Sequence, residues 1–120
     1  MALNKNAKAW VKALRGRRFK QAKHYLYAGS NQYCCLGIAC KLYQEQHKLG
    51  KPHYLKVKQE TCLPDEVMDW LGLADREGGY VDVDQPDDLN HLTNLNDNKG
   101  FTFKQIADVI ESEPEGLFVE

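Results

Sequence analysis

The most apolar stretch of the 120-residue chain runs from residue 33 to residue 43 and contains three of the four cysteines. Small residues at Gly37 and Ala39 would allow another element to approach this stretch closely. We therefore expect a central helix over residues 34–47, around which the rest of the chain packs. The apolar residues recur at i, i+3, i+4 and i+7, the pattern of a helix that buries one face: Leu36, Ala39, Cys40 and Tyr43.

Length and composition limit the class of protein. A chain of this length has the usual size of one domain, and we expect a single domain over residues 1–120. Hydrophobic residues make up 42% of the chain, which is enough for a core. No stretch approaches the roughly 20 apolar residues of a membrane span, and the N-terminus lacks the apolar core of a signal peptide. The sequence therefore predicts a soluble protein of the cytoplasm.

The cysteines fit a reducing compartment. Cys34 and Cys35 are neighbours in the expected helix, where their side chains point in different directions and a disulfide between them would be strained. A buried free thiol behaves as a small hydrophobic group. We interpret the cysteines of the central helix as packing residues.

Charge is distributed unequally along the chain, although the net charge is only −1. Residues 1–44 contain nine lysines or arginines and no acidic residue, whereas residues 45–120 contain all seventeen acidic residues and seven basic ones. This asymmetry predicts either a basic surface for a polyanion or two halves that attract each other.

Further elements follow from apolar spacing and from residues that begin or end helices. Asn4 or Asn6 can cap the first helix and Gly16 can end it, while Thr102 and Gln105 form a capping box for the last one. We expect an α+β fold, a compact and mostly helical domain with a few short strands. The other expected helices cover residues 6–15, 63–73, a segment that starts at 87–88 and carries Leu89, Leu92 and Leu95, and a segment that starts at 102. The expected strands cover 24–28, 54–58 and 80–84, with 117–119 as a short tail that adds an edge strand.

The basic segment near the N-terminus is the best candidate for a ligand site. Arginine binds two phosphate oxygens at once, and Tyr25 or Tyr33 could stack on a base. The alternative is a plain charged surface that faces the acidic half. The residues expected to hold phosphates are Arg15, Arg17, Arg18, Lys20 and Lys23.

Other candidate sites match known chemistry less well. The cysteine spacing lacks the paired ligands of a structural zinc site, and the aspartates between residues 82 and 88 break the calcium-loop pattern. Cys34 at the start of a helix could be a nucleophile, but a core role is favoured. Asn96 and Asp97 form either a helix-ending turn or a polar site. We expect no metal and no cofactor, and the common phosphate-binding and hydrolase motifs are absent.

Cys34-Cys35-Leu36-Gly37 and Leu95-Asn96-Asp97 occur together with four further short segments spread along the chain. In this order the segments resemble a family of small, mostly uncharacterised proteins of tailed bacteriophages and prophages. The resemblance covers nearly the whole chain, and its most specific parts are Cys34-Cys35-Leu36-Gly37 and Leu95-Asn96-Asp97. Because the family has no assigned activity, it supplies no catalytic residues. It implies a phage accessory protein in the cytoplasm of a bacterial host. The other matching segments are Trp10 to Gly16, Leu63-Pro64, Trp70 to Leu73, and Phe103 to Ile110.

The leading hypothesis is a binding protein without enzymatic activity that counteracts or redirects a host defence function. Its partner would be a phosphorylated nucleotide, which it sequesters, or a host protein, which it blocks. The first alternative is a small nucleic-acid-binding protein that uses the basic N-terminal half. The second is a small enzyme that uses a cysteine or the Asn96-Asp97 turn.

Overall fold

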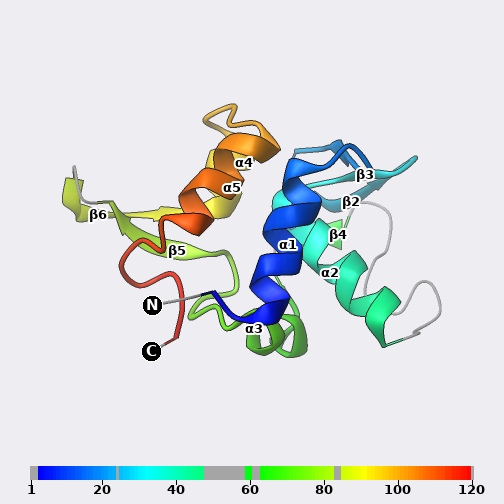
Figure 1. Ribbon diagram of the computed structural model, residues 1–120. Helices are drawn as coiled ribbons and strands as arrows, with labels where there is room; N and C mark the ends of the chain where they lie inside the picture. The colour runs from blue at the N-terminus through cyan, green and yellow to red at the C-terminus, as the bar shows by residue number, and fades with distance from the viewer. Residues whose placement is uncertain (1–2, 24, 48–58, 61–62, 83–84, 120) are drawn as a thin grey trace.

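The computed structural model describes residues 3–23, 25–47, 59–60, 63–82 and 85–119. Helix α2 (Cys35–Gln46) lies at the centre of the fold (Figure 1). Cys34 caps the helix, with its sulfur accepting the Gly37 N–H at 3.4 Å. All residues from Cys35 to Cys40 are buried, whereas the apolar spacing predicted one buried face. This half of α2 has no exposed side because other elements surround it: α1 (Lys5–Arg15), α3 (Asp65–Leu71), α4 (Leu92–Asp97) and β2 (Tyr25–Gly29).

Strand β2 makes the closest approach to α2. A Cβ atom built on Gly37 would lie 1.7 Å from the carbonyl oxygen of Leu26, a separation that real atoms cannot adopt. The Cys34 N–H also donates to this oxygen, at 3.3 Å. The close approach expected from the small residues of the central helix is therefore confirmed at Gly37.

Helix α1 lies beside α2 and follows the predicted pattern. Asn4 is its cap, because the Asn4 side chain accepts the Ala7 N–H at 2.7 Å, and the helix ends at Gly16. The indole N–H of Trp10 donates to the Cys35 carbonyl at 2.8 Å and joins the two helices inside the core. The buried face of α1 consists of Ala7, Trp10, Val11 and Leu14.

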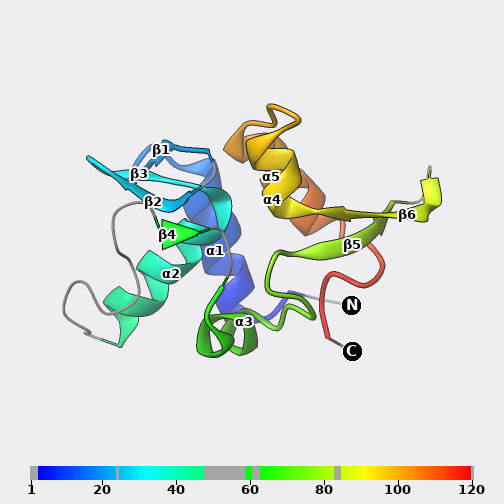
Figure 2. The same ribbon diagram turned by 180° about the vertical axis from the view of Figure 1, so that it is seen from behind.

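A four-stranded sheet covers one end of the helices, in the order β1-β3-β2-β4 (Figures 1 and 2). Strand β1 (Lys20–Gln21) runs parallel to β3 (Gln32–Tyr33), and β2 is antiparallel to both β3 and β4 (Gln59–Glu60). The expected strand at 24–28 corresponds to β2. The expected strand at 54–58 lies outside the described residues.

The other sheet is a hairpin of β5 (Gly79–Asp82) and β6 (Gln85–His91), at the opposite end of the molecule from β1–β3. The prediction of a helix from 87–88 onward is wrong for residues 87–91, which belong to β6. Strand β6 pairs with β5 in the register Gly79–His91 and Tyr80–Asn90. The leucine spacing is compatible with a helix. The pairing with β5, which depends on the tertiary fold, outweighs this local preference. Helix α4 begins only at Leu92.

The last helix, α5 (Phe103–Glu111), has the predicted capping box between Thr102 and Gln105. It contacts α1 and α4 and buries one face, which consists of Phe103, Ile106, Ala107 and Ile110. The tail adds a single bridge between Leu73 and Phe118. Every helix in the described part of the chain is too short or too polar to cross a lipid bilayer. Five helices and two small sheets in the described part of the chain make this an α+β fold, as the sequence predicted.

Candidate functional site

Two of the predicted phosphate-binding arginines form ion pairs with the acidic half of the chain. Arg15 donates to Asp108 at 2.7 Å and to Glu111, both on α5, and Arg18 pairs with Glu45 on α2. These pairs match the alternative interpretation of the charge asymmetry, in which the halves of the chain attract each other. A ligand phosphate would have to compete with carboxylates already in place.

The other three predicted cations are exposed. Arg17 lies between α1 and β1, Lys20 lies in β1, and Lys23 follows β1. None of the three has an ion pair within the part of the chain that the structure describes. The chain in and around β1 therefore carries three exposed positive charges.

The two tyrosines predicted to stack on a base differ in exposure. Tyr33 is buried, stacks on Tyr27 at 4.9 Å between ring centroids and meets the edge of Phe19 at 5.1 Å. A base could reach its ring only if this packing opened. Tyr25 on β2 is partly exposed.

The cysteines of the central helix are buried free thiols, as the sequence analysis proposed. Burial raises the pKa of Cys34 to about 12 and outweighs the helix N-terminus, whose backbone N–H groups favour the thiolate. Burial also raises the pKa of Cys35 and of Cys40. These thiols lack the thiolate character and the access that a nucleophile needs. Cys62 lies outside the described residues.

Asn96 is fully buried in α4 and connects this helix to the segment around β1. Its amide nitrogen donates to the Ala22 carbonyl and to the Asp97 carboxylate, both at 2.8 Å, and its oxygen accepts from Gln21 at 2.8 Å. The amide is thus used in internal hydrogen bonds. This geometry favours a structural role for Asn96 over a polar ligand site.

We expect Asn96→Ala to lower the free energy of unfolding by about 2 kcal/mol, because the buried Ala22 carbonyl would lose its Asn96 donor. The Gln21 amide would lose one of its two acceptors and keep the Phe101 carbonyl. Urea unfolding monitored by circular dichroism measures the change. Asn94→Ala is the matched control, because Asn94 shares only an exposed hydrogen bond with Asn98. This substitution should lower the free energy of unfolding by less than about 0.5 kcal/mol. Equal losses in the two variants would contradict the structural role.

A groove of about 700 Å³ follows α1 and reaches the end of α5. Leu3 and Val11 supply apolar surface, while Lys8, Lys12 and Arg15 supply positive charge opposite Glu111. Lys8 and Lys12 are exposed and have no ion pair among the described residues. The groove therefore combines an apolar wall with two available ammonium groups. Of the predicted site residues, only Arg15 lines it.

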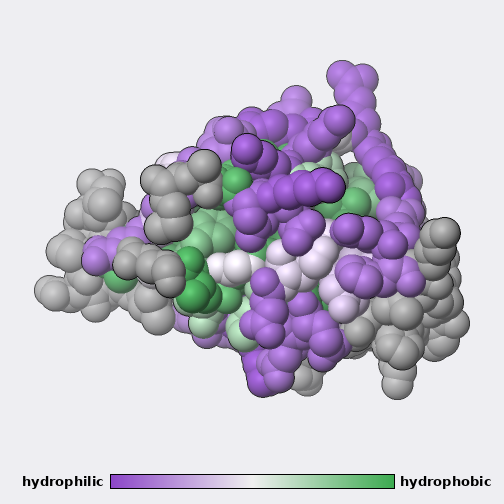
Figure 3. Space-filling model, turned by 60° about the horizontal axis from the view of Figure 1, so that its bottom comes forward, coloured by the Kyte–Doolittle hydropathy of each residue, from purple (hydrophilic) through white to green (hydrophobic). Residues whose placement is uncertain are grey.

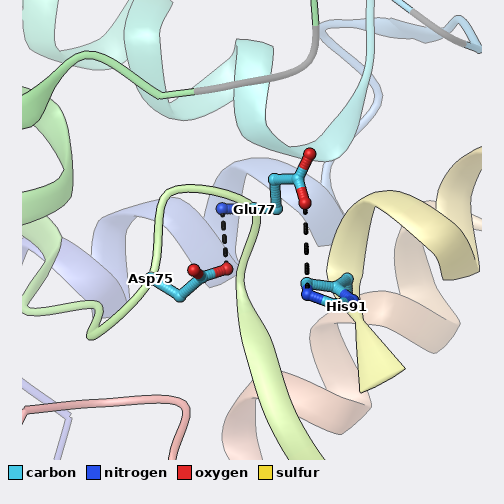
Figure 4. Close-up of side chains that lie close together, drawn as sticks. All are labelled: Asp75, Glu77 and His91. Atoms are coloured by element: carbon cyan, nitrogen blue, oxygen red, sulfur yellow. Dashed lines mark hydrogen bonds and ion pairs between the residues drawn. The ribbon is translucent and has the colours of Figure 1, made fainter. Parts of the chain in front are cut away.

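A second cluster of polar side chains lies where the loop after α3 meets the end of β6 (Figure 4). One ligand atom from each of Asp75, Glu77 and His91 lies within 4.8 Å of the other two. The Glu77 carboxylate is 4.0 Å from His91 Nε2, and Asp75 Oδ2 accepts the backbone N–H groups of Glu77 and Gly79 at 3.0 and 3.1 Å. The three residues offer one nitrogen and two carboxylates on one small surface.

The chain matches the profile of the domain of unknown function DUF8296 over residues 3–114. The protein belongs to this family. No curated protein and no solved structure shows significant similarity to the chain. The DUF8296 profile assigns no activity, so the function has to be argued from the groove, the exposed cations and the polar cluster.

The sequence analysis did not identify the two groupings that the fold creates. Lys8 and Lys12 both lie on α1, but the apolar wall beside them includes Leu3, which precedes the helix, and the groove extends to α5. Asp75 and Glu77 alternate in sequence, but they meet His91 only through the β5–β6 pairing. The Gly78-Gly79 pair was the available signal, because adjacent glycines often mark close backbone approach.

Proposed function

We propose that this DUF8296 protein acts by binding a phosphorylated nucleotide in the groove beside α1. The observation that supports the proposal most is the combination of Lys8 and Lys12, without ion pairs among the described residues, with the apolar surface of Leu3 and Val11. A nucleotide complements this combination, because its flat base can pack on the apolar surface while its anionic phosphates meet the lysines. Specific small-molecule sites are concave, mainly apolar and equipped with a few polar groups.

The spacing of the lysines suits a phosphate group. Residues four apart lie on the same side of a helix, so both ammonium groups can donate to oxygens of one phosphate chain. Arg15 is held by Asp108 and Glu111 and would form the wall at the end of the groove. This proposal keeps Arg15 from the predicted set and replaces the other cations with Lys8 and Lys12.

The resemblance to phage proteins gives the proposal a biological setting. A phage accessory protein that sequesters a nucleotide would counteract a host defence that depends on that nucleotide. Blocking a host protein is the alternative within the same setting. Native mass spectrometry of gently purified protein distinguishes nucleotide sequestration from the blocking of a host protein. A retained nucleotide would add a few hundred daltons to the native mass, and a blocked host protein would not.

We expect the double variant Lys8→Ala/Lys12→Ala to weaken nucleotide binding about tenfold or more, since each lost charge–phosphate contact contributes about 1 kcal/mol. Isothermal titration calorimetry with ATP, GTP and cyclic di-GMP as probes measures the affinity. Alanine is a good helix former, so the fold of α1 should persist. Lys20→Ala/Lys23→Ala is the control with the same charge change at the sheet, and its affinity should stay near that of the unmodified protein. Equal affinity of the two double variants, or no binding by the unmodified protein, would contradict the proposal.

A small nucleic-acid-binding protein is the second candidate, because Arg17, Lys20 and Lys23 are exposed and lack ion pairs among the described residues. In this case the effects of the same two double variants on binding of single-stranded DNA would be reversed. Affinity would also fall steeply with salt, because each neutralised phosphate releases counterions.

A further inference from the structure

We propose that Asp75, Glu77 and His91 form a binding site for a divalent transition-metal cation, with Zn²⁺ as the representative ion. This site is separate from the groove beside α1, and the nucleotide proposal does not depend on it. Three features support the site: the set of donor atoms, the rigid backbone of the loop that carries two of the donors, and a glycine that leaves space for the third.

The donor set suits a borderline metal ion. Imidazole nitrogen together with carboxylate oxygen is a common ligand combination for zinc and for iron or manganese. His91 Nε2 faces Glu77 Oε2 at 4.0 Å, too far for a hydrogen bond but close enough for both atoms to approach a shared ion. The side chain of Glu77 is half exposed, so it can move the remaining distance without disturbing the core.

The loop that carries the two carboxylates is held by backbone hydrogen bonds. The Leu92 and Thr93 N–H groups at the start of α4 donate to the carbonyls of Gly78 and Glu77, at 3.0 and 3.4 Å. Asp75 is fixed in turn by the N–H groups of Glu77 and Gly79. The Asp75 carboxylate and the backbone that carries Glu77 are therefore positioned beside His91 before any ion arrives, which reduces the entropy cost of binding.

Gly79 provides the space in which His91 and Asp75 meet. A Cβ atom at this position would lie 3.2 Å from Asp75 Oδ2 and 3.4 Å from His91 Nε2, tighter than ordinary contacts. Gly79 lacks the positive φ that commonly requires glycine, and Gly78 beside it has φ +72°. The glycine at 79 is thus explained by the approach of two potential ligands, and not by the local backbone.

Titration of the purified protein with ZnCl₂, monitored by calorimetry, tests the site. We expect one Zn²⁺ ion per chain at this site and a loss of affinity of about tenfold or more in both Glu77→Gln and His91→Gln. These two substitutions leave the backbone braces of the loop in place. All variants retain the four cysteines, so any binding by thiols is common to them.

Two controls match the charge and the type of the altered residues. Glu66→Gln removes an exposed carboxylate at the start of α3, and His47→Gln removes an exposed imidazole at the end of α2. Both should bind Zn²⁺ as the unmodified protein does.

A second measurement locates the ion. Mn²⁺, which has little affinity for thiols, should broaden the imidazole resonances of His91 in the NMR spectrum and leave those of His47 sharp. The proposal is overturned if the unmodified protein binds no Zn²⁺, if Glu77→Gln and His91→Gln bind it as tightly as the controls, or if Mn²⁺ broadens both histidines equally.

Discussion

Gly37→Ala is expected to be among the most damaging single-methyl changes in this protein. The added methyl carbon would be placed 1.7 Å from the Leu26 carbonyl oxygen and 2.7 Å from its carbon. Both are backbone atoms of β2, so no side-chain rotation can relieve the overlap, and α2 and β2 must move apart. Overpacking of this kind should lower the free energy of unfolding by about 3 kcal/mol. For a chain of this length the melting temperature should fall by about 10 °C.

Gly16→Ala is the matched control for this experiment. Gly16 ends α1 with φ −83°, and a Cβ there would meet only helix carbonyl oxygens at 3.5 and 3.6 Å. The substitution should stay within about 1 kcal/mol of the unmodified protein or stabilise it slightly, because alanine restricts the unfolded chain. Thermal unfolding of both variants by circular dichroism measures the difference. If the two melting temperatures agreed, Gly37 and Leu26 could not be in the contact described above.

Alkaline pH should destabilise the protein steeply because burial raises the pKa of Cys34, Cys35 and Cys40. Below about pH 7 all three thiols are protonated in both the folded and the unfolded state, and they add no pH dependence. Above their ordinary pKa of about 8.5, the unfolded chain loses these protons while the folded chain keeps them. The free energy of unfolding should then fall by about 1.4 kcal/mol per pH unit for each thiol, or about 4 kcal/mol per unit for the three together.

Urea unfolding at pH 8 and at several values up to pH 10.5, with reductant present, gives this slope. Lysines and tyrosines also titrate in this range, so the informative quantity is a difference between variants. Cys40→Ala should reduce the slope by about 1.4 kcal/mol per pH unit, whatever its effect on stability at pH 8. An unchanged slope would mean that the Cys40 thiol ionises in the folded protein as readily as in the unfolded one.

Local sequence signals predicted the helices that begin and end with specific side-chain chemistry. The Asn4 cap and the Thr102–Gln105 capping box act within a few residues of chain, so their interactions are readable from spacing. The helix expected over residues 63–73 has its end at Gly72, which closes α3 in the left-handed conformation. The buried stripes of α1 and α5 followed from helical periodicity for the same reason.

The segment from residue 87 to residue 95 shows where local signals are insufficient. Its leucine spacing fits a helix, yet residues up to His91 belong to β6 because they have a partner strand in β5. The stabilisation comes from cross-strand contacts with residues about ten positions away, which periodicity alone does not record. The helix prediction is therefore wrong up to His91 and right from Leu92 onward, and Leu92 and Leu95 are buried.

The sequence by itself determined the central helix, its close approach through Gly37, the burial of its thiols and the α+β class. These features depend on residue size, apolar spacing and capping, which are local properties of the chain. Only the tertiary structure decided which charged and polar side chains lie together on the surface. It paired Arg15 and Arg18 with carboxylates, left Lys8 and Lys12 beside an apolar groove, and brought His91 to Asp75 and Glu77. Charges act through space, so the pairs they form depend on which elements the core places side by side.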